Sequence, residues 1–265
     1  MSGKSAKMAR RRAAYAAAAA QAPAVRSWKL PPGIQLAPFD SPEALWSIDE
    51  ASSAFIADYD SPGSLAARRE RRRNELDELF ADDPSSTPSI FAIAATNEAM
   101  DGLCGAALLE PFYGEDLLAQ DRDAGRLMAR AHRVLAALFV VPNFRGKGIA
   151  SALLDVASLA VVRDRGRYLE GFVDDHDGSA DFYRRAGAAV TSHNEPLPPR
   201  PPVNLKTTHY PGKNGHWFSV YGWERHHDKI RCSRCGGALD FLPANGGDLR
   251  CPRCQRPDGS PRGGR

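Results

Sequence analysis

Long apolar runs are missing from this sequence. No eighteen consecutive residues are apolar, so we expect no membrane-spanning helix. The alanine-rich stretch after three arginines imitates a secretory signal, but residues 13–24 contain no Leu, Ile or Phe. We therefore predict that residues 1–30 form a disordered, basic, alanine-rich tail.

Acidic residues are also absent from residues 1–30, which carry seven Lys or Arg. In residues 224–265, nine basic residues face five acidic ones. Because the whole chain has a net charge of +3, residues 31–223 carry a net charge of −8. Basic ends hint at a polyanionic partner, but the interpretation we prefer is that these tails are simply solvated. An acidic middle that faced a cleft would favour a cationic amine.

Cysteine is scarce, and four of the five cysteines form two pairs, Cys232-x-x-Cys235 and Cys251-x-x-Cys254. Fifteen residues separate the pairs, which is a spacing that presents four thiolates to one tetrahedral Zn²⁺. Residues 238–250 between them read as a hairpin, so residues 225–258 resemble a zinc ribbon, followed by a disordered tail at 259–265. Four protein ligands leave no open position, so this zinc would be structural. Two disulfides are the alternative; free thiolates place the chain in a reducing cytoplasm.

The two commonest glycine-rich phosphate motifs are missing as well. A P-loop would need Gly at Val141 and Ser or Thr at Gly148, and a dinucleotide fingerprint would need Gly at Ser151. What is present is an apolar strand at 135–141, ended by Pro142, and then a glycine loop that opens a helix at 148–164. The unpaired N–H groups of a helix N-terminus bind anions, so the loop predicts a phosphate-bearing ligand.

The loop residues Arg145-Gly146-Lys147-Gly148-Ile149-Ala150 form the pattern Arg-x-x-Gly-x-Ala. This pattern resembles the acetyl-CoA pyrophosphate loop of the GNAT N-acetyltransferases. A second signature of that family, Asn-x-x-Ala-x-x-Phe-Tyr-x-x-x-Gly-Phe, is similar to residues 177–188. Ala180, Phe182, Tyr183 and Gly187 fit it, whereas Asp177 replaces the usual Asn and Ala188 the usual Phe.

The resemblance implies an α/β fold with a mixed sheet in residues 31–224, of element order β-α-α-β-β-β-α-β-α-β-β, and the zinc ribbon appended to it. Periodicity and capping signals predict strands at 33–38, 89–95, 100–111, 168–173, 188–190 and 216–223, and helices at 42–57, 62–81 and from 179 onward. Residues 113–131 read as irregular or helical. Asp177 or Ser179 is expected to cap the helix after 179. The arginine run at 68–73 reads as a solvated helix face, or else as a route for anions. Cys104 is expected in the core.

The resemblance further implies an acetyl-CoA-dependent N-acetyltransferase in which an amine attacks the thioester directly. Tyr183 would be the general acid, unless it only packs against the cofactor arm, and an N–H near Phe139 or Val140 would polarise the thioester carbonyl. The cofactor-binding residues would be Phe139, Val140, Val141, Arg145, Gly146, Lys147, Gly148, Ile149, Ala150 and Asp177.

The base and the acceptor stay open at this point. Glu110, Glu170 and His176 are candidate bases, and aminoglycosides, polyamines, amino acids and protein amines are candidate acceptors. The proline-rich loop at 195–202 is expected to lie over the site. An alternative function is an acyl-CoA-sensing adaptor that binds nucleic acid or protein through the ribbon and the basic tails.

Overall fold

The computed structural model describes most of the predicted catalytic region and a few residues near the C-terminus. The described residues are 30–56, 60–97, 102–111, 121–164, 166–175, 178–197, 214–221, 240–242, 248–250 and 253–254. The predicted tails at 1–30 and 259–265 lie outside this set, except Leu30. The chain divides into two compact units, and neither is a continuous stretch of sequence. The first comprises Met1–Ala66, Phe91–Leu108 and Ala137–Val156, and the second Ala67–Ile90, Leu109–Ala136 and Ala157–Arg265.

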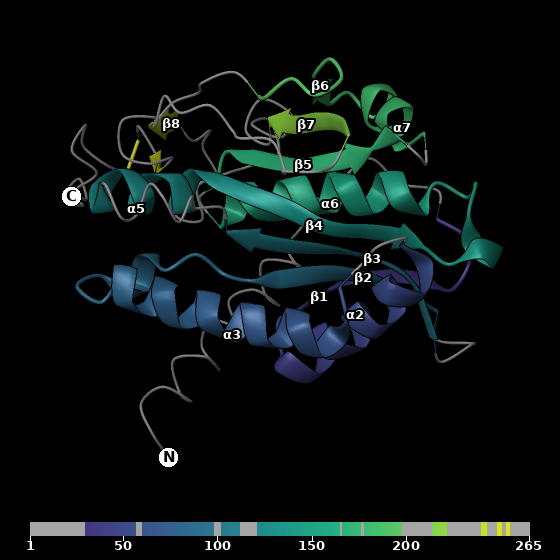
Figure 1. The fold of residues 1–265 in the computed structure, drawn as a ribbon, viewed down its shortest axis with the longest axis horizontal. Coiled ribbons are helices and arrows are strands. Elements are labelled where there is room, and N and C mark those ends of the chain that lie inside the picture. The colour runs from purple at the N-terminus through teal and green to yellow at the C-terminus, as the bar shows by residue number, and fades with distance from the viewer. Residues whose placement is uncertain are drawn as a thin grey trace. The chain divides into compact units, whose positions relative to one another are not determined.

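Seven strands form one mixed sheet in the order β1-β2-β3-β4-β5-β7-β6 (Figure 1). β4 and β5 are parallel, whereas β1–β2, β5–β7 and β6–β7 are antiparallel. This confirms the predicted α/β fold class with a mixed sheet. The strands are β1 (Ile34–Phe39), β2 (Phe91–Asn97), β3 (Gly102–Pro111), β4 (His132–Val140), β5 (Tyr168–Asp174), β6 (Ala189–Val190) and β7 (Gly215–Tyr221).

Five α-helices occur in the described part of the chain, and one of them begins with the capping signals read from the sequence. They are α2 (Pro42–Phe55), α3 (Pro62–Leu79), α5 (Arg122–Ala131), α6 (Ile149–Arg163) and α7 (Ser179–Arg185). Ser41 caps α2 by accepting the N–H of Ala44 at 3.2 Å, and Pro42 takes the first helical position as predicted. Helix α6 follows β4 after the loop at 141–148, which confirms the predicted strand–loop–helix. None of the described helices is long and apolar enough to cross a membrane.

The start of β4 differs from the prediction. The strand begins at His132 instead of Leu135, directly after α5, which occupies the end of the segment predicted as irregular or helical. The prediction missed this start because His132 and Arg133 are polar, although both are buried. Arg133 is fully buried because its guanidinium donates to the carbonyl of Ala129 at 2.7 Å and to the carboxylate of Asp164 at 2.7 Å.

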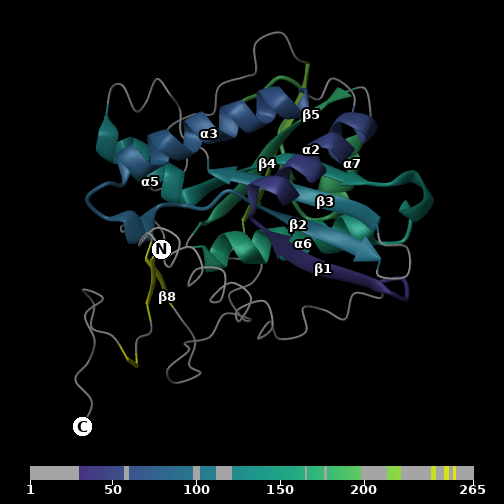
Figure 2. The same cartoon turned by 90° about the horizontal axis from the view of Figure 1, so that it is seen from below.

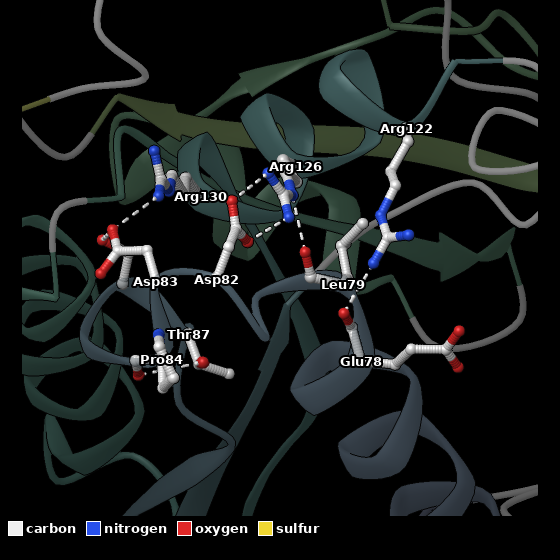
Figure 3. A network of polar contacts seen from close by, with 10 residues as sticks. Glu78, Leu79, Asp82, Asp83, Pro84, Thr87, Arg122, Arg126 and Arg130 are labelled. Carbon is white, nitrogen blue, oxygen red and sulfur yellow. Dashed lines mark hydrogen bonds and ion pairs between the residues drawn. The ribbon is translucent and has the colours of Figure 1, made fainter.

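Two arginines of α5, spaced one turn apart, cap the C-terminus of α3. Arg122 donates to the carbonyl of Glu78 at 2.7 Å, and Arg126 donates to that of Leu79 at 2.6 Å and also to the carboxylate of Asp82 (Figure 3). The last carbonyls of a helix have no intrahelical partner, so these cations satisfy the C-terminus of α3. The hydrogen bond from Arg126 is the main reason why the pKa of Asp82 is lowered from its usual value.

The arginine run on α3 is only partly the solvated face that the sequence predicts. Arg71 is exposed, but Arg69 is buried, and Arg72 forms an ion pair with the buried carboxylate of Glu110 on β3. Burial of these charges requires partners, which a periodicity argument does not detect.

The C-terminal segment contains the predicted hairpin. β8 (Asp240–Leu242) pairs antiparallel with β9 (Asp248–Arg250), and Phe241 is opposite Leu249. The turn at 243–247 lies outside the described residues.

Candidate active site

The loop after β4 has a backbone that requires glycine at two positions. Gly146 has φ 72° and Gly148 has φ 80°, both in the left-handed region. No atom lies within 4 Å of a Cβ built at either position, so conformation rather than space selects glycine. Residues 145–148 are exposed, whereas Ile149 is buried and anchors the start of α6. The loop thus presents bare backbone to solvent.

The first turn of α6 offers N–H donors beside that backbone. Ala152 donates to the carbonyl of Gly148 at 3.1 Å, which is the first bond of the helix. The N–H groups of Ile149, Ala150 and Ser151 precede it and have no intrahelical acceptor. Lys147 is held 5.1 Å above the ring of Phe144, so a cation stands at the same end. The arrangement is suited to an anion.

The end of β4 has one edge turned toward β3 and one turned away from it. Val141 donates its N–H to the carbonyl of Cys104 at 2.9 Å, and a Cβ on Gly105 would lie 2.6 Å from the carbonyl oxygen of Phe139. Because successive residues of a strand point their N–H and C=O groups to opposite edges, Phe139 faces β3 and Val140 faces the other edge. Arg145 agrees with this, since its Nε donates to the carbonyl of Val140 at 3.0 Å. Of the two predicted carbonyl-polarising positions, only Val140 points its N–H away from β3.

Cys104 is buried beside this strand end, as predicted, and burial raises the pKa of its thiol. Phe139, on β4, is also buried and stacks on Phe55 at the end of α2, with ring centroids 5.8 Å apart. Both contacts lie within the first unit, as does the whole loop.

Tyr183 lies on α7 in the second unit and is 6% exposed. Its ring stacks on that of Phe218 of β7, with centroids 3.7 Å apart and an interplanar angle of 12°. A Cβ on Gly171 of β5 would lie 2.5 Å from the Phe218 ring, so glycine at 171 makes room for the ring that supports Tyr183. The sequence analysis missed Gly171 and Phe218; a glycine inside an apolar strand is the signal that a close approach leaves.

The start of α7 corrects one prediction. Its N-cap is Gly178, which has φ 66°, and Ser179 is the first residue of the helix. Neither Asp177 nor Ser179 is the cap, because the chain enters the helix through a left-handed turn that glycine adopts most easily. Asp177 and His176 lie outside the described residues.

Two of the three candidate bases are buried and paired. Glu110 is held by Arg72, and Glu170 on β5 lies 3.1 Å from Nδ1 of His132. Both carboxylates are thus withdrawn from solvent, and each has a partner side chain.

A titratable cluster that the sequence analysis missed lies at the end of β5. Asp175 is 2.6 Å from Nε2 of His193 and 3.4 Å from Nε2 of His216, while Nδ1 of His216 donates to the carbonyl of Thr191 at 2.8 Å. These residues are far apart in sequence, and the pairing of β7 with β5 and β6 brings them together. His193 and His216 flank the segment that contains the proline-rich loop. Residues 198–213 of this segment lie outside the described part of the chain.

Of the four cysteines predicted to bind zinc, the structure describes only Cys254. Cys254 is partly exposed and forms no disulfide, and Cys232, Cys235 and Cys251 lie outside the described residues. Among the residues that the structure describes, no group of three or more His, Cys, Asp or Glu is placed to hold a metal ion.

Solved structures of similar fold include several acetyltransferases. Ard1 from Thermoplasma volcanium is 16% identical with a TM-score of 0.43, over 71% of this chain and 97% of that chain. The phosphinothricin acetyltransferase of Sinorhizobium meliloti, solved with AcCoA, is 16% identical with a TM-score of 0.43, over 71% and 88%. yncA from Salmonella typhimurium, solved with its cofactor acetyl-CoA, is 14% identical with a TM-score of 0.45, over 76% and 99%. Scores and identities this low carry no argument about the substrate.

A match at the level of the sequence family carries more weight. No curated protein matches the chain. The acetyltransferase (GNAT) domain family, however, matches residues 88–187. The matched residues contain β4, the loop at 145–150, and Tyr183. The chain therefore contains an acetyltransferase (GNAT) domain at residues 88–187.

Proposed function

We propose that the chain transfers the acetyl group of acetyl-CoA to a primary amine by direct attack within a ternary complex. The observation that carries the proposal is the exposed loop at 145–148, with its two left-handed glycines, followed by the N–H groups of the first turn of α6. Holding the thioester and the amine side by side lowers the barrier by several kcal/mol without a covalent enzyme intermediate.

The loop binds the diphosphate of the cofactor in this proposal. The N–H groups of Gly146, Gly148, Ile149 and Ala150 donate to phosphate oxygens, and Lys147 adds a positive charge. Arg145 has a different role, because its Nε is engaged by the carbonyl of Val140 and so ties the loop to the end of β4. The predicted contacts of Val141 and Asp177 with the cofactor remain predictions; the N–H of Val141 is used by Cys104.

The N–H of Val140 donates to the thioester oxygen. It points to the edge of β4 that faces away from β3, whereas the backbone of Phe139 is turned toward β3. A donor aimed at an oxygen that becomes negative in the tetrahedral intermediate stabilises the transition state more than the ground state.

Tyr183 protonates the leaving group. The amine nitrogen bonds to the carbonyl carbon to give the tetrahedral intermediate and loses a proton to water. As the carbonyl re-forms, the carbon–sulfur bond breaks and the thiolate of CoA takes the phenol proton, which water returns to the phenolate. The stack on Phe218 fixes the ring, which favours a role that depends on position. Because the buried Glu110 and Glu170 are both engaged, we assign no protein base.

The two cysteine pairs near the C-terminus bind one structural Zn²⁺ in this proposal. The hairpin of β8 and β9 lies between the pairs, as it does in a zinc ribbon. Four thiolates suit a tetrahedral zinc ion, which would supply folding energy to a segment too short for its own core.

The deciding experiment is release of free CoA thiol from acetyl-CoA by the purified full chain. The acceptors to be tried are a polyamine, an aminoglycoside, a free amino acid and a peptide with a free N-terminus. We expect amine-dependent thiol release with at least one of them, together with heat when acetyl-CoA is titrated into the protein. Absence of acetyl-CoA binding by calorimetry would refute the proposal.

A further inference from the structure

One aromatic contact lies where the acyl group of the cofactor would be. Phe55 is the last residue of α2 and follows Leu45, Ile48 and Ser52, which are buried on one face of that helix. These four residues are three, four and three positions apart, which is the spacing of one helix face, so Phe55 lies on the buried face of α2. Its ring is half-buried and stacks on Phe139 of β4, with an interplanar angle of 23°.

The aromatic pair of Phe55 and Phe139 adjoins Val140 through Phe139. Phe139 immediately precedes Val140, whose N–H we assign to the thioester oxygen. Side chains alternate between the two faces of a strand, so the Phe139 ring lies on the face that α2 covers and the Val140 side chain lies on the other. The aromatic pair is therefore one residue from the group that would hold the reacting carbonyl.

The diphosphate site lies on the opposite face. Figures 1 and 2 place α2 and the first turns of α6 on opposite sides of the strands β2 and β3. A cofactor anchored at the N-terminus of α6 brings its sulfur to the carbonyl from that face. The bond on the other side of the carbonyl carbon then directs the acyl chain toward α2, where Phe55 and Phe139 stand.

We propose that Phe55, stacked on Phe139, sets the length of the acyl group, so that the chain accepts acetyl-CoA and rejects longer acyl-CoA thioesters. The proposal rests on the proposed function, because it needs the cofactor bound at the α6 loop. Each further methylene would meet the faces of two fixed rings, and rejection of one or two methylenes by a rigid wall amounts to about tenfold or more. Phe55, rather than the buried Phe139, is the residue to change, because it is half-exposed and ends its helix.

The test is calorimetric titration of CoA, acetyl-CoA and butanoyl-CoA into the full chain. It is run on the wild type, Phe55→Ala, Phe55→Leu and Trp46→Ala. Trp46 is the matched control, because it is an exposed aromatic residue on the same helix. We expect the wild type to bind butanoyl-CoA about tenfold or more weakly than acetyl-CoA. Phe55→Ala should bring the two affinities close together and leave that for CoA unchanged, while Trp46→Ala behaves as the wild type.

The outcomes separate the two proposals. If Phe55→Ala keeps the wild-type preference, or if the wild type binds butanoyl-CoA as tightly as acetyl-CoA, the inference is wrong and the proposed function stands. If the wild type binds none of the three compounds, the cofactor site itself is wrong. Phe55→Leu is the second variant, for use if the alanine variant does not fold, because it keeps an apolar side chain at the helix end. We expect it to shift the preference for acetyl-CoA over butanoyl-CoA in the same direction but by less.

Discussion

At the scale of single residues, the candidate site depends on glycines that the structure uses for two different reasons. Gly148 is needed for a left-handed backbone in open space, whereas Gly171 is needed because a neighbouring ring occupies the place of a Cβ. Substitution therefore has different consequences at the two positions. At 148 it affects the loop and its ligand, and at 171 it affects packing beneath Tyr183.

Gly148→Asp should reduce acetyl-CoA affinity by at least a hundredfold, measured by calorimetry. The new carboxylate repels the diphosphate, and a side chain at φ 80° costs about 1–2 kcal/mol of backbone strain. Gly148→Ala should show only the part due to strain. Gly63→Asp is the matched control: Gly63 lies in the first turn of α3, with open space around it, and should leave affinity unchanged.

Tyr183→Phe should lower turnover about a hundredfold or more and leave acetyl-CoA affinity nearly unchanged, because only the hydroxyl is lost and the stack on Phe218 persists. Thiol release under saturating cofactor, with calorimetry on the same sample, measures both quantities. Wild-type turnover in this variant would mean that the ring only packs.

Gly171→Ala should destabilise the fold by about 1–3 kcal/mol, because the Phe218 ring must move away from the new methyl group. Thermal unfolding reports the loss. If packing is the cause, Gly171→Ala combined with Phe218→Leu should recover part of the stability, and a double variant no more stable than Gly171→Ala would contradict this account.

At the scale of elements, the C-terminus of α3 is held by cations from α5, and this contact is sensitive to acid. Arg126 lowers the pKa of Asp82, so the ionised carboxylate is favoured in the folded state. The stabilisation is present above the unfolded pKa and is lost as the pH falls through the lowered folded value. Asp82 is exposed, so the effect is small and is screened by salt.

Asp82→Asn should therefore lower the unfolding temperature slightly at pH 7 and have no effect at a pH below the folded pKa of Asp82. Thermal unfolding at both pH values and at low ionic strength measures the difference. Asp181→Asn removes an exposed carboxylate that pairs with Arg184 within α7, and it serves as the control for an ordinary surface pair. Equal effects of the two substitutions at neutral pH would show that capping of α3 adds nothing.

The helices and strands also show how much of the fold could be predicted from the sequence. Period and capping signals predicted β1, α2, α6 and β5 within a residue or two, since each has a continuous apolar face and a local start signal. They misplaced the start of β4, because His132 and Arg133 are buried by partners on other elements. The cluster of Asp175, His193 and His216 left no local signal at all, because only strand pairing assembles it.

At the scale of the whole molecule, the proposed catalytic residues and the cysteine pairs occupy different parts of the chain. The GNAT domain covers residues 88–187, and all four paired cysteines come later. We therefore expect cofactor binding and zinc binding to be separable.

Metal analysis should find one zinc per chain in the wild type and less in Cys254→Ser. Cys104→Ala is the matched control, because Cys104 is the buried fifth cysteine and should keep the full zinc content. Acetyl-CoA affinity should not change in Cys254→Ser. Full zinc content in that variant would show that the thiolates are not the ligands.

Four of the five boundaries between the two compact units fall inside α3, β3, β4 and α6, and the fifth lies at the start of β2. No single cut of the polypeptide can release either unit as an uninterrupted piece, so a shortened chain that stops midway would leave halves of strands and helices without the rest of the element. Shortening this protein for crystallisation or fusion is thus best attempted from its extremities.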